Sequence, residues 1–341
     1  MRVLILTPRQ PQETGNGVTA RRHQLTLSRT GSLVDILEVC PDEAAVIDEF
    51  ALSFRPDLFH LLHAYRTGKP FLNSTQVHKR PFVVTLTGTD INEDIDHAEK
   101  GEIVKTVLSL TAAIITQNRV TASIFPRDFP QFADRLHYIA PGIILGNAPY
   151  ALRRQHDIPE DCCLFLHPAS IRPVKQNLEL LRLFDPLARL RHDFVVAFCG
   201  PVLDSDYGRI FLQEIHKRPW ARYIGTIPTA NMPAAIAAAD IILNHSLSEG
   251  MPNALIESAV IGRPILARHI PGNAAFVDHG QNGLLYQNDQ DFLRNAETLC
   301  SSRQIRQRLS QPRPEAYDAQ EEARQLTALY SRAVKTRGKP A

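Results

Sequence analysis

The stretch Ser246-Leu-Ser-Glu249-Gly-Met-Pro-Asn-Ala-Leu-Ile-Glu257, which runs on to Gly262, decides the fold of this 341-residue chain. It follows Asp240-Ile-Ile-Leu-Asn244, a short β-branched and apolar run that predicts a buried parallel strand. We expect a loop at Glu249 and then a helix that ends at Gly262. Such junctions after buried strands are where α/β proteins present backbone N–H groups to anionic ligands. The stretch therefore predicts an α/β fold with a ligand site here.

Apolar runs typical of buried strands alternate with helical patterns along the whole chain. They cover residues 3–7, 33–37, 58–62, 82–86 and 113–116 in the first half, and 164–167, 194–199, 222–224, 241–244, 265–267 and 283–286 in the second. Strands that alternate with helices form parallel sheets with right-handed crossovers. We therefore expect two Rossmann-like domains, at residues 1–150 and 151–315, with a polar linker at 147–161. A last helix is predicted at about 316–334.

Composition narrows the class of protein. The length suggests roughly two domains, and the net charge of +2 gives no reason to expect binding to nucleic acid. No apolar run approaches the roughly 20 residues that span a bilayer, so no transmembrane segment is predicted. Among the five cysteines only Cys162 and Cys163 are adjacent, and no Cys-x2-Cys spacing occurs. We expect no zinc site, reduced thiols and a cytoplasmic protein.

The full pattern from Ser246 to Pro264 resembles the signature of the retaining, nucleotide-sugar-dependent glycosyltransferases of group 1, or family 4. That signature runs Ser-x-x-Glu-Gly-x-Pro, then Glu after seven residues, then Gly-x-Pro, and each element is present. Residues 88–94 (GTDINED) and 266–275 (LARHIPGNAA) also look like a branch called glycosyltransferase 1 domain-containing protein 1. The resemblance implies the GT-B fold, in which two Rossmann-like domains face a cleft and the final helix crosses back onto the first domain.

The same resemblance implies roles for the residues around the two carboxylates. Glu257 would accept hydrogen bonds from the two ribose hydroxyls of a nucleotide, and a carboxylate suits a cis-diol because each oxygen can take one bond. Glu249 would face the donor sugar. The expected donor-binding backbone around it comprises Gly250, Met251, Pro252 and Asn253, with Gly272 and Asn273 from the next loop.

Gly15-Asn-Gly17 follows the first strand and precedes a helical pattern. Paired glycines allow backbone N–H groups to approach a phosphate or sugar. Read alone, the segment is as well explained by an ordinary turn, and it lacks the Gly-x-Gly-x-x-Gly spacing of a dinucleotide site. In the resembled family this loop lines the cleft near the diphosphate, so Gly15 and Gly17 are expected to bind the donor.

Arg172 and Lys175 follow the first strand of the second half. An Arg fork and a Lys point charge at a strand's carboxyl end can both reach a diphosphate, although a solvated basic loop explains most such pairs. The segment looks like the family's diphosphate clamp, whose Arg and Lys are separated by four residues. Here two intervene and Ser170 takes the family's Arg position. We expect Lys175 to carry over directly and Arg172 to act from a shifted position.

His63 and Asp90 follow strands of the first half. Either side chain could orient an acceptor hydroxyl or a donor sugar hydroxyl, whereas a lone His at a strand end is often structural. Many relatives carry a His-Asp pair where this chain has Thr89-Asp90. Both His63 and Asp90 are therefore expected at the catalytic site, and the role of Thr89 stays open.

These observations predict a retaining glycosyltransferase that moves a sugar from a nucleoside diphosphate, of uridine type, to an unidentified acceptor. The family has no Asp-x-Asp in its site, so no metal and no cofactor are expected. Charge on the departing diphosphate would be offset by Arg172, Lys175 and helix N-termini. The alternatives are selenosugar synthase-like transfer to a selenium or sulfur acceptor, a nucleotide-sugar epimerase or hydrolase, and a dehydrogenase or non-catalytic sugar-binding protein.

Overall fold

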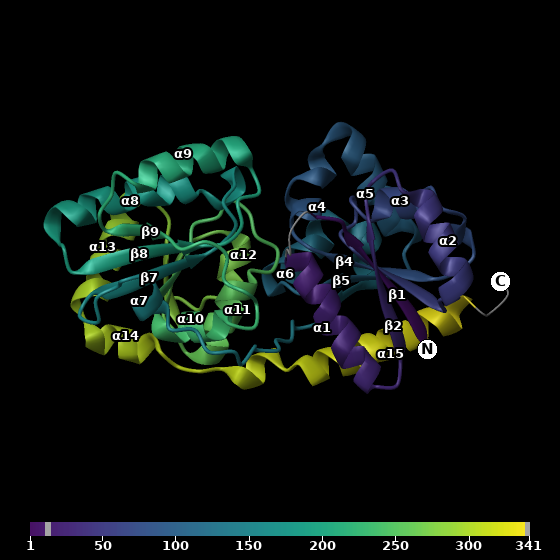
Figure 1. Cartoon of the computed structure of the whole chain (residues 1–341). Coiled ribbons are helices and arrows are strands. Elements are labelled where there is room, and N and C mark those ends of the chain that lie inside the picture. The colour runs from purple at the N-terminus through teal and green to yellow at the C-terminus, as the bar shows by residue number, and fades with distance from the viewer. Residues whose placement is uncertain (11–14, 338–341) are drawn as a thin grey trace. The chain divides into compact units, whose positions relative to one another are not determined.

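The computed structural model describes residues 1–10 and 15–337 (Figure 1). The chain divides into two compact units. The first comprises Met1–Ile144 and the segment that starts at Asp318, and the second is Leu145–Tyr317. The sequence-based boundaries at residues 150 and 315 lie close to these divisions. Each unit contains one six-stranded parallel sheet, which confirms the predicted α/β class.

The first unit has the strand order β2-β1-β3-β4-β5-β6. Its strands are β1 (Arg2–Pro8), β2 (Leu33–Val39), β3 (Leu58–Leu62), β4 (Phe82–Leu86), β5 (Ala113–Thr116) and β6 (Leu136–Tyr138). Its helices are α1 (Gly15–Arg29), α2 (Ala44–Phe54), α3 (Gly68–Leu72), η1 (Thr75–His78), α4 (Thr89–Asn92), η2 (Asp94–Asp96), α5 (Ala98–Leu110), α6 (Arg119–Asp128), η3 (Pro130–Arg135) and α15 (Ala319–Arg337).

Alternation along β1 builds two cores in this unit. Leu4 and Leu6 point to a core shared with α2, α3 and α5, whereas Val3 and Ile5 point to a core shared with α1 and α15. Successive side chains of a strand face opposite sides of a sheet, so a strand covered on both faces is apolar throughout. Figure 1 shows α1 and α15 over the same face of the sheet.

The second unit has the strand order β12-β11-β10-β7-β8-β9. Its strands are β7 (Cys163–Pro168), β8 (Phe194–Cys199), β9 (Ala221–Tyr223), β10 (Ile241–Asn244), β11 (Ile265–Arg268) and β12 (Gly283–Tyr286). Its helices are α7 (Leu152–Gln155), η4 (Pro173–Lys175), α8 (Asn177–Leu190), α9 (Ser205–Ile215), α10 (Met232–Ala238), α11 (Asn253–Ile261), α12 (Pro271–Ala274), α13 (Asp289–Ser301), α14 (Arg303–Leu309) and η5 (Pro314–Tyr317).

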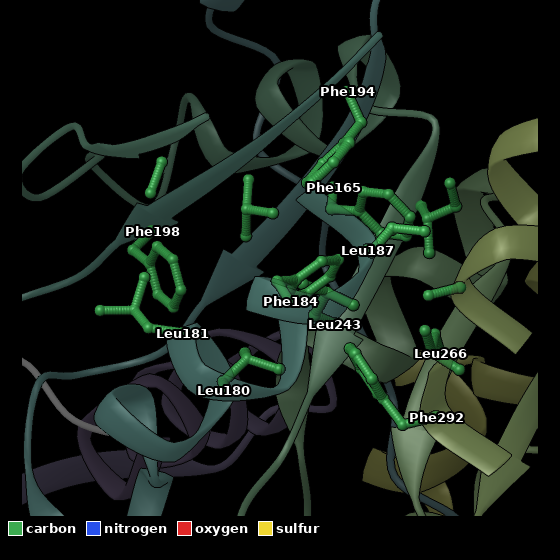
Figure 2. Packing of buried hydrophobic residues seen from close by; sticks show 14 of the residues in the cluster. Phe165, Leu180, Leu181, Phe184, Leu187, Phe194, Phe198, Leu243, Leu266 and Phe292 are labelled. Atoms are coloured by element: carbon green, nitrogen blue, oxygen red, sulfur yellow. The ribbon is translucent and has the colours of Figure 1, made fainter. Parts of the chain in front are cut away.

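Aromatic packing defines the larger core of the second unit (Figure 2). Phe184 of α8 lies with its ring centroid 5.0 Å from that of Phe165 on β7 and 4.9 Å from that of Phe292 on α13. Both contacts are edge-to-face, a preferred geometry for aromatic pairs. This core packs β7 against α8. The loop between these two elements contains Lys175.

Helix α11 begins and ends close to where the sequence predicts. Pro252 is its N-cap residue, and Gly262 is its C-cap with a φ of 79°. The Gly262 N–H donates to the Ser258 carbonyl, as in a left-handed helix cap. Glu257 therefore lies one turn inside the helix, as expected from the motif.

A buried polar cluster joins α1 to α15 in the first unit. Glu322 accepts hydrogen bonds from Arg22 Nε (2.8 Å) and Nη2 (2.9 Å), lies 3.0 Å from His23 Nε2, and is bonded by Gln117. The Glu322 side chain is fully buried. Burial acts to raise the pKa of Glu322, but the charges of Arg22 and His23 outweigh it and lower that pKa. The ion pair thus fixes α15 against α1.

No helix in the described part of the chain is both long and apolar enough to cross a bilayer.

Candidate active site

The candidate site of the second unit lies where three neighbouring strands end. β11, β10 and β7 are adjacent and parallel, so their carboxyl ends share one edge of the sheet. β7 leads into the loop with η4, β10 into the loop before α11, and β11 into α12. This edge is where open α/β sheets bind ligands. It brings together the sequence-predicted residues of all three loops.

Glu249 is the centre of this arrangement. Its Oε1 atom accepts hydrogen bonds from Lys175 Nζ (2.5 Å), Ser246 Oγ (2.6 Å) and Asn244 Nδ2 (3.0 Å). Burial acts to raise the pKa of Glu249, but the Lys175 charge and these hydrogen bonds outweigh it, so that pKa is lowered. No donor to Oε2 is found in the described residues. Glu249 is therefore an ionised carboxylate with one oxygen held by the protein.

Lys175 ends η4, and Arg172 is the N-cap residue of the same short helix. The Lys175 side chain is 16% exposed. The Arg172 backbone N–H donates to Asn177 Oδ1 at 3.2 Å, and Leu247 N donates to the Val174 carbonyl at 2.9 Å. The two loops are thus joined by a backbone bond as well as by the ion pair. Both predicted cations lie on one short turn.

Glu257 differs from Glu249 in its surroundings. It is 8% exposed, and no hydrogen bond or ion pair to its carboxylate is found among the described residues. Burial raises its pKa to about 7. After burial of that thiol, the charge of Glu257 also contributes to raising the pKa of Cys199, which ends β8. A buried carboxylate without a protein partner is suited to accept hydrogen bonds from a ligand.

The other predicted donor-binding residues divide into two groups. Gly250, Met251, Pro252 and Asn253 form the turn into α11, where no hydrogen-bond partner of the buried Asn253 Oδ1 atom is found in the described residues. Asn273 is fully buried and donates to Asn244 Oδ1 (3.2 Å) and the Arg268 carbonyl (2.9 Å). Gly272 packs on Glu249 so closely that a Cβ atom would overlap the Glu249 carbonyl oxygen. These contacts of Gly272 and Asn273 are with the protein itself.

His63 and Thr89 form a hydrogen-bonded pair in the first unit. His63 Nε2 lies 2.9 Å from Thr89 Oγ1, across the ends of β3 and β4. The Nδ1 atom of His63 accepts backbone N–H bonds from Tyr65 and Arg66, both at 3.2 Å. His63 has a φ of 103°, a strained value for a residue with a side chain. Burial is the main cause that lowers its pKa.

Asp90 is fully buried and acts on the backbone around this pair. Its carboxylate accepts from Ala64 N (2.9 Å), Thr87 N (3.0 Å) and Gly88 N (2.9 Å). It therefore fixes the loop after β3 to the loop after β4. Its contacts are those of a positioning residue.

Gly15 and Gly17 lie in the first turn of α1, which starts at Gly15. The sequence places them ahead of the helix, whereas the structure includes them in it. Residues 11–14, which precede them, lie outside the described part of the chain.

Sequence reasoning missed several polar residues of the second unit. Asn244 and Ser246 bond directly to Glu249, and a polar residue at the end of an apolar strand was the available signal. His167, at the end of β7, is fully buried, and no partner of either ring nitrogen is found in the described residues. Burial is the main cause that lowers its pKa to about 3, with smaller contributions from His245 and Lys175. It is therefore neutral at physiological pH.

No cluster of three or more His, Cys, Asp or Glu side chains that could hold a metal ion is found within the described residues. Metal independence stays a prediction.

Residues 151–315 match the family model for Glycosyl transferases group 1. The second unit is a group 1 glycosyltransferase domain. Glycosyltransferase 1 domain-containing protein 1 of Xenopus tropicalis is 25% identical to this chain over 308 residues, 87% of each protein. The resemblance drawn from the Glu249–Glu257 motif is thereby confirmed, and the chain is a glycosyl-transferring enzyme.

Solved structures show the same fold over 98% of the chain. Sucrose-phosphate synthase from Thermosynechococcus elongatus matches with a TM-score of 0.83 at 15% identity, and 99% of that chain is covered. Anabaena HepE in complex with UDP-glucose matches with a TM-score of 0.74 at 17% identity, again over 99% of that chain. The two six-stranded parallel sheets of this glycosyltransferase are those of the GT-B fold.

Proposed function

We propose that this glycosyltransferase transfers a sugar, with retention, from a uridine diphosphate sugar to an acceptor. The observation that carries the proposal is the Lys175–Glu249 pair at the carboxyl edge of the second sheet, with the buried Glu257 on the helix that follows the same loop. The structure of HepE with UDP-glucose supports the choice of nucleotide.

The leaving diphosphate is stabilised by the η4 loop. Lys175 supplies a point charge and Arg172 a planar fork, and negative charge grows on the diphosphate as the glycosidic bond breaks. Lys175 is held by Glu249, so its ammonium is oriented by the protein itself. Three N–H donors allow it to keep Glu249 and gain a phosphate oxygen.

The two carboxylates bind different parts of the donor. Glu257 accepts the ribose hydroxyls, because its carboxylate has no competing protein donor in the described residues. Glu249 offers Oε2 to a sugar hydroxyl, while Oε1 is occupied by Lys175, Ser246 and Asn244. Asn273 donates to Asn244 and Gly272 packs on the backbone of Glu249, so both contact the loop that carries Glu249.

The proposed transfer step uses no nucleophile of the protein. The acceptor attacks from the face that the diphosphate leaves, and the departing phosphate oxygen takes the acceptor proton. This route retains the configuration at the anomeric carbon, and it asks the protein mainly for positioning and electrostatic stabilisation.

Calorimetric titration with uridine diphosphate, UDP-glucose and other nucleotide sugars tests the donor assignment. Binding of uridine diphosphate, followed by slow donor hydrolysis or transfer with retention, is the expected result. A protein that binds no nucleoside diphosphate would refute the proposal. Turnover of the donor to an epimer without any transfer would reassign the chain to epimerase chemistry.

A further inference from the structure

The hydrogen bonds around His63 determine which residue donates in the His63–Thr89 pair. The backbone N–H groups of Tyr65 and Arg66 both point at His63 Nδ1, so that nitrogen accepts and carries no hydrogen. In a neutral imidazole the proton then sits on Nε2. Nε2 lies 2.9 Å from Thr89 Oγ1, so His63 donates and Thr89 accepts.

The Thr89 hydroxyl therefore keeps its own hydrogen to donate. No acceptor for it is found among the described residues. The Thr89 residue is partly exposed, unlike its neighbours Gly88 and Asp90, which are buried. A hydroxyl that accepts one hydrogen bond becomes a stronger donor in the next, because successive bonds polarise one another. The chain of donors runs from two backbone amides through His63 to Thr89.

The backbone keeps this relay in place at a cost. His63 has a φ of 103°, and its carbonyl accepts from Thr67 Oγ1 at 2.8 Å. Asp90 bonds to the backbone of Ala64, next to His63, and of Gly88, next to Thr89. Strained backbone that surrounding contacts maintain is typical of functional sites. A surface threonine without a role would not require it.

We propose that Thr89 is a substrate-binding residue of the transfer reaction, which donates a hydrogen bond to a hydroxyl oxygen of the sugar or acceptor. His63 and Asp90 are positioning residues for it. The inference rests on the proposed function for the class of its ligand, a polyhydroxyl substrate. It assigns the open position next to Asp90, and it explains how a histidine at position 63 can act through its neighbour.

The Thr89→Val and Thr89→Ser pair tests this assignment. Valine keeps the shape and removes the hydroxyl, whereas serine keeps the hydroxyl. Thr89→Val is expected to lower kcat/KM for UDP-glucose hydrolysis or transfer about tenfold to a hundredfold, as for loss of a bond to a buried partner. Thr89→Ser should stay within about threefold of wild type. The Kd for uridine diphosphate alone should be unchanged in both variants, because its proposed ligands lie in the second unit.

Equal kcat/KM values for wild type and Thr89→Val would overturn the inference and leave the proposed function intact. An equal loss in Thr89→Val and Thr89→Ser would also overturn it, as would a matching loss of uridine diphosphate affinity. A wild-type protein that neither binds nor turns over any nucleotide sugar would instead refute the proposed function.

The relay itself has a readout that does not depend on substrate. Nitrogen-15 NMR of the histidine rings should show His63 as the Nε2–H tautomer, with Nδ1 unprotonated. His63→Asn assigns the signal, since asparagine tolerates positive φ better than most residues. A His63 ring protonated on Nδ1 would reverse the direction of the bond and remove the basis of the inference.

Discussion

Lys175 and Glu249 form an ion pair with Nζ 2.5 Å from Oε1, and it joins the loop after β7 to the loop after β10. Both side chains are largely buried, at 16% and 9% exposure. A cation assigned to the diphosphate and a carboxylate assigned to the sugar thus hold each other in place. Loss of either one leaves the other charge poorly compensated.

Lys175→Ala should therefore reduce stability as well as activity. We expect a loss on the order of 1–3 kcal/mol in the free energy of unfolding, because Ser246 and Asn244 still bond to Glu249. The double variant Lys175→Ala/Glu249→Gln should recover part of that loss, since the uncompensated charge is gone. Urea unfolding of the single and double variants measures both values. A double variant less stable than Lys175→Ala alone would contradict this account of the pair.

Arg172→Ala should lower kcat rather than merely raise KM. A cation beside the departing diphosphate stabilises the transition state more than the ground state, and removal of an oxyanion donor costs on the order of 10²–10³ in kcat. Arg172→Ala/Lys175→Ala should fall short of the product of the single effects, because neighbouring charges on one phosphate are coupled. Steady-state transfer or donor hydrolysis provides the measurement. A folded Arg172→Ala enzyme with wild-type kcat would place Arg172 outside the reacting centre.

Uridine diphosphate affinity should depend on pH through Glu257. Burial raises the pKa of this carboxyl to about 7, and the ionised form is the better acceptor for two ribose hydroxyls. Affinity is therefore expected to rise as pH increases through 7, and Glu257→Gln should flatten that profile. Glu249→Ala should lower uridine diphosphate affinity less than Glu257→Gln does, since it removes only the partner that orients Lys175, and it should weaken discrimination among sugars. Equal losses in the two variants would contradict the assignment.

The raised pKa of Glu257 also predicts that the protein becomes less stable as pH rises, whereas its affinity for uridine diphosphate increases. A carboxyl whose pKa rises from 4.5 to about 7 on folding favours the folded state while protonated, and this contribution is lost as pH rises between those values. The shift corresponds to roughly 3 kcal/mol. Ligand-free Glu257→Gln should therefore be more stable than wild type at pH 8. Thermal unfolding at pH 5 and pH 8 compares the two proteins, and a variant less stable at pH 8 would argue against a buried, uncompensated charge.

Donor binding should survive a chelator. The proposed diphosphate ligands are Lys175 and Arg172, and no metal-holding carboxylate cluster is found in the part of the chain that the structure describes. Titration of uridine diphosphate with and without EDTA should give equal Kd values. A large loss with EDTA, restored by Mg²⁺ or Mn²⁺, would assign a metal to the site.

Glu322→Ala should destabilise the protein strongly, whereas Glu321→Ala should change its stability little. Glu322 is buried between Arg22 and His23, and breaking a buried ion pair on one side costs about 3–5 kcal/mol. Glu321 pairs with Arg324 at the surface, where such pairs contribute little. Urea unfolding of the two variants tests the contrast. Similar midpoints would show that Glu322 does not fix α15.

Much of the fold could be predicted from the sequence because buried parallel strands read as short apolar runs. The bounds of β3, β4, β5, β8, β10 and β12 agree with the predicted ranges, and the other predicted strands differ by one or two residues at one or both ends. β6 (Leu136–Tyr138) was missed. It is short, at the sheet edge and largely not buried, so its sequence lacks the apolar pattern.

The sequence motif identified Glu249 and Lys175 as candidate site residues, but their contact could not be predicted from it. Glu249 and Lys175 lie far apart in the sequence, and only the order of β10 and β7 in the sheet brings them into contact. The Asp90 contacts could not be predicted, since they depend on the turns after β3 and β4. The His63–Thr89 bond could not be predicted either, because His63 has a positive φ and a histidine in the sequence gives no sign of that conformation.

The return of the chain to its first unit has a consequence for synthesis on the ribosome. Leu326 and Tyr330 of α15 complete the core that Val3 and Ile5 begin, yet they are translated only after the whole second unit. The face of the first sheet that α1 and α15 share is therefore covered only in part, by α1, until the second unit has been translated and α15 follows. The second unit has all of its strands and helices in one continuous segment. We therefore expect translation that halts before α15 to leave apolar surface of the first unit exposed, which favours aggregation.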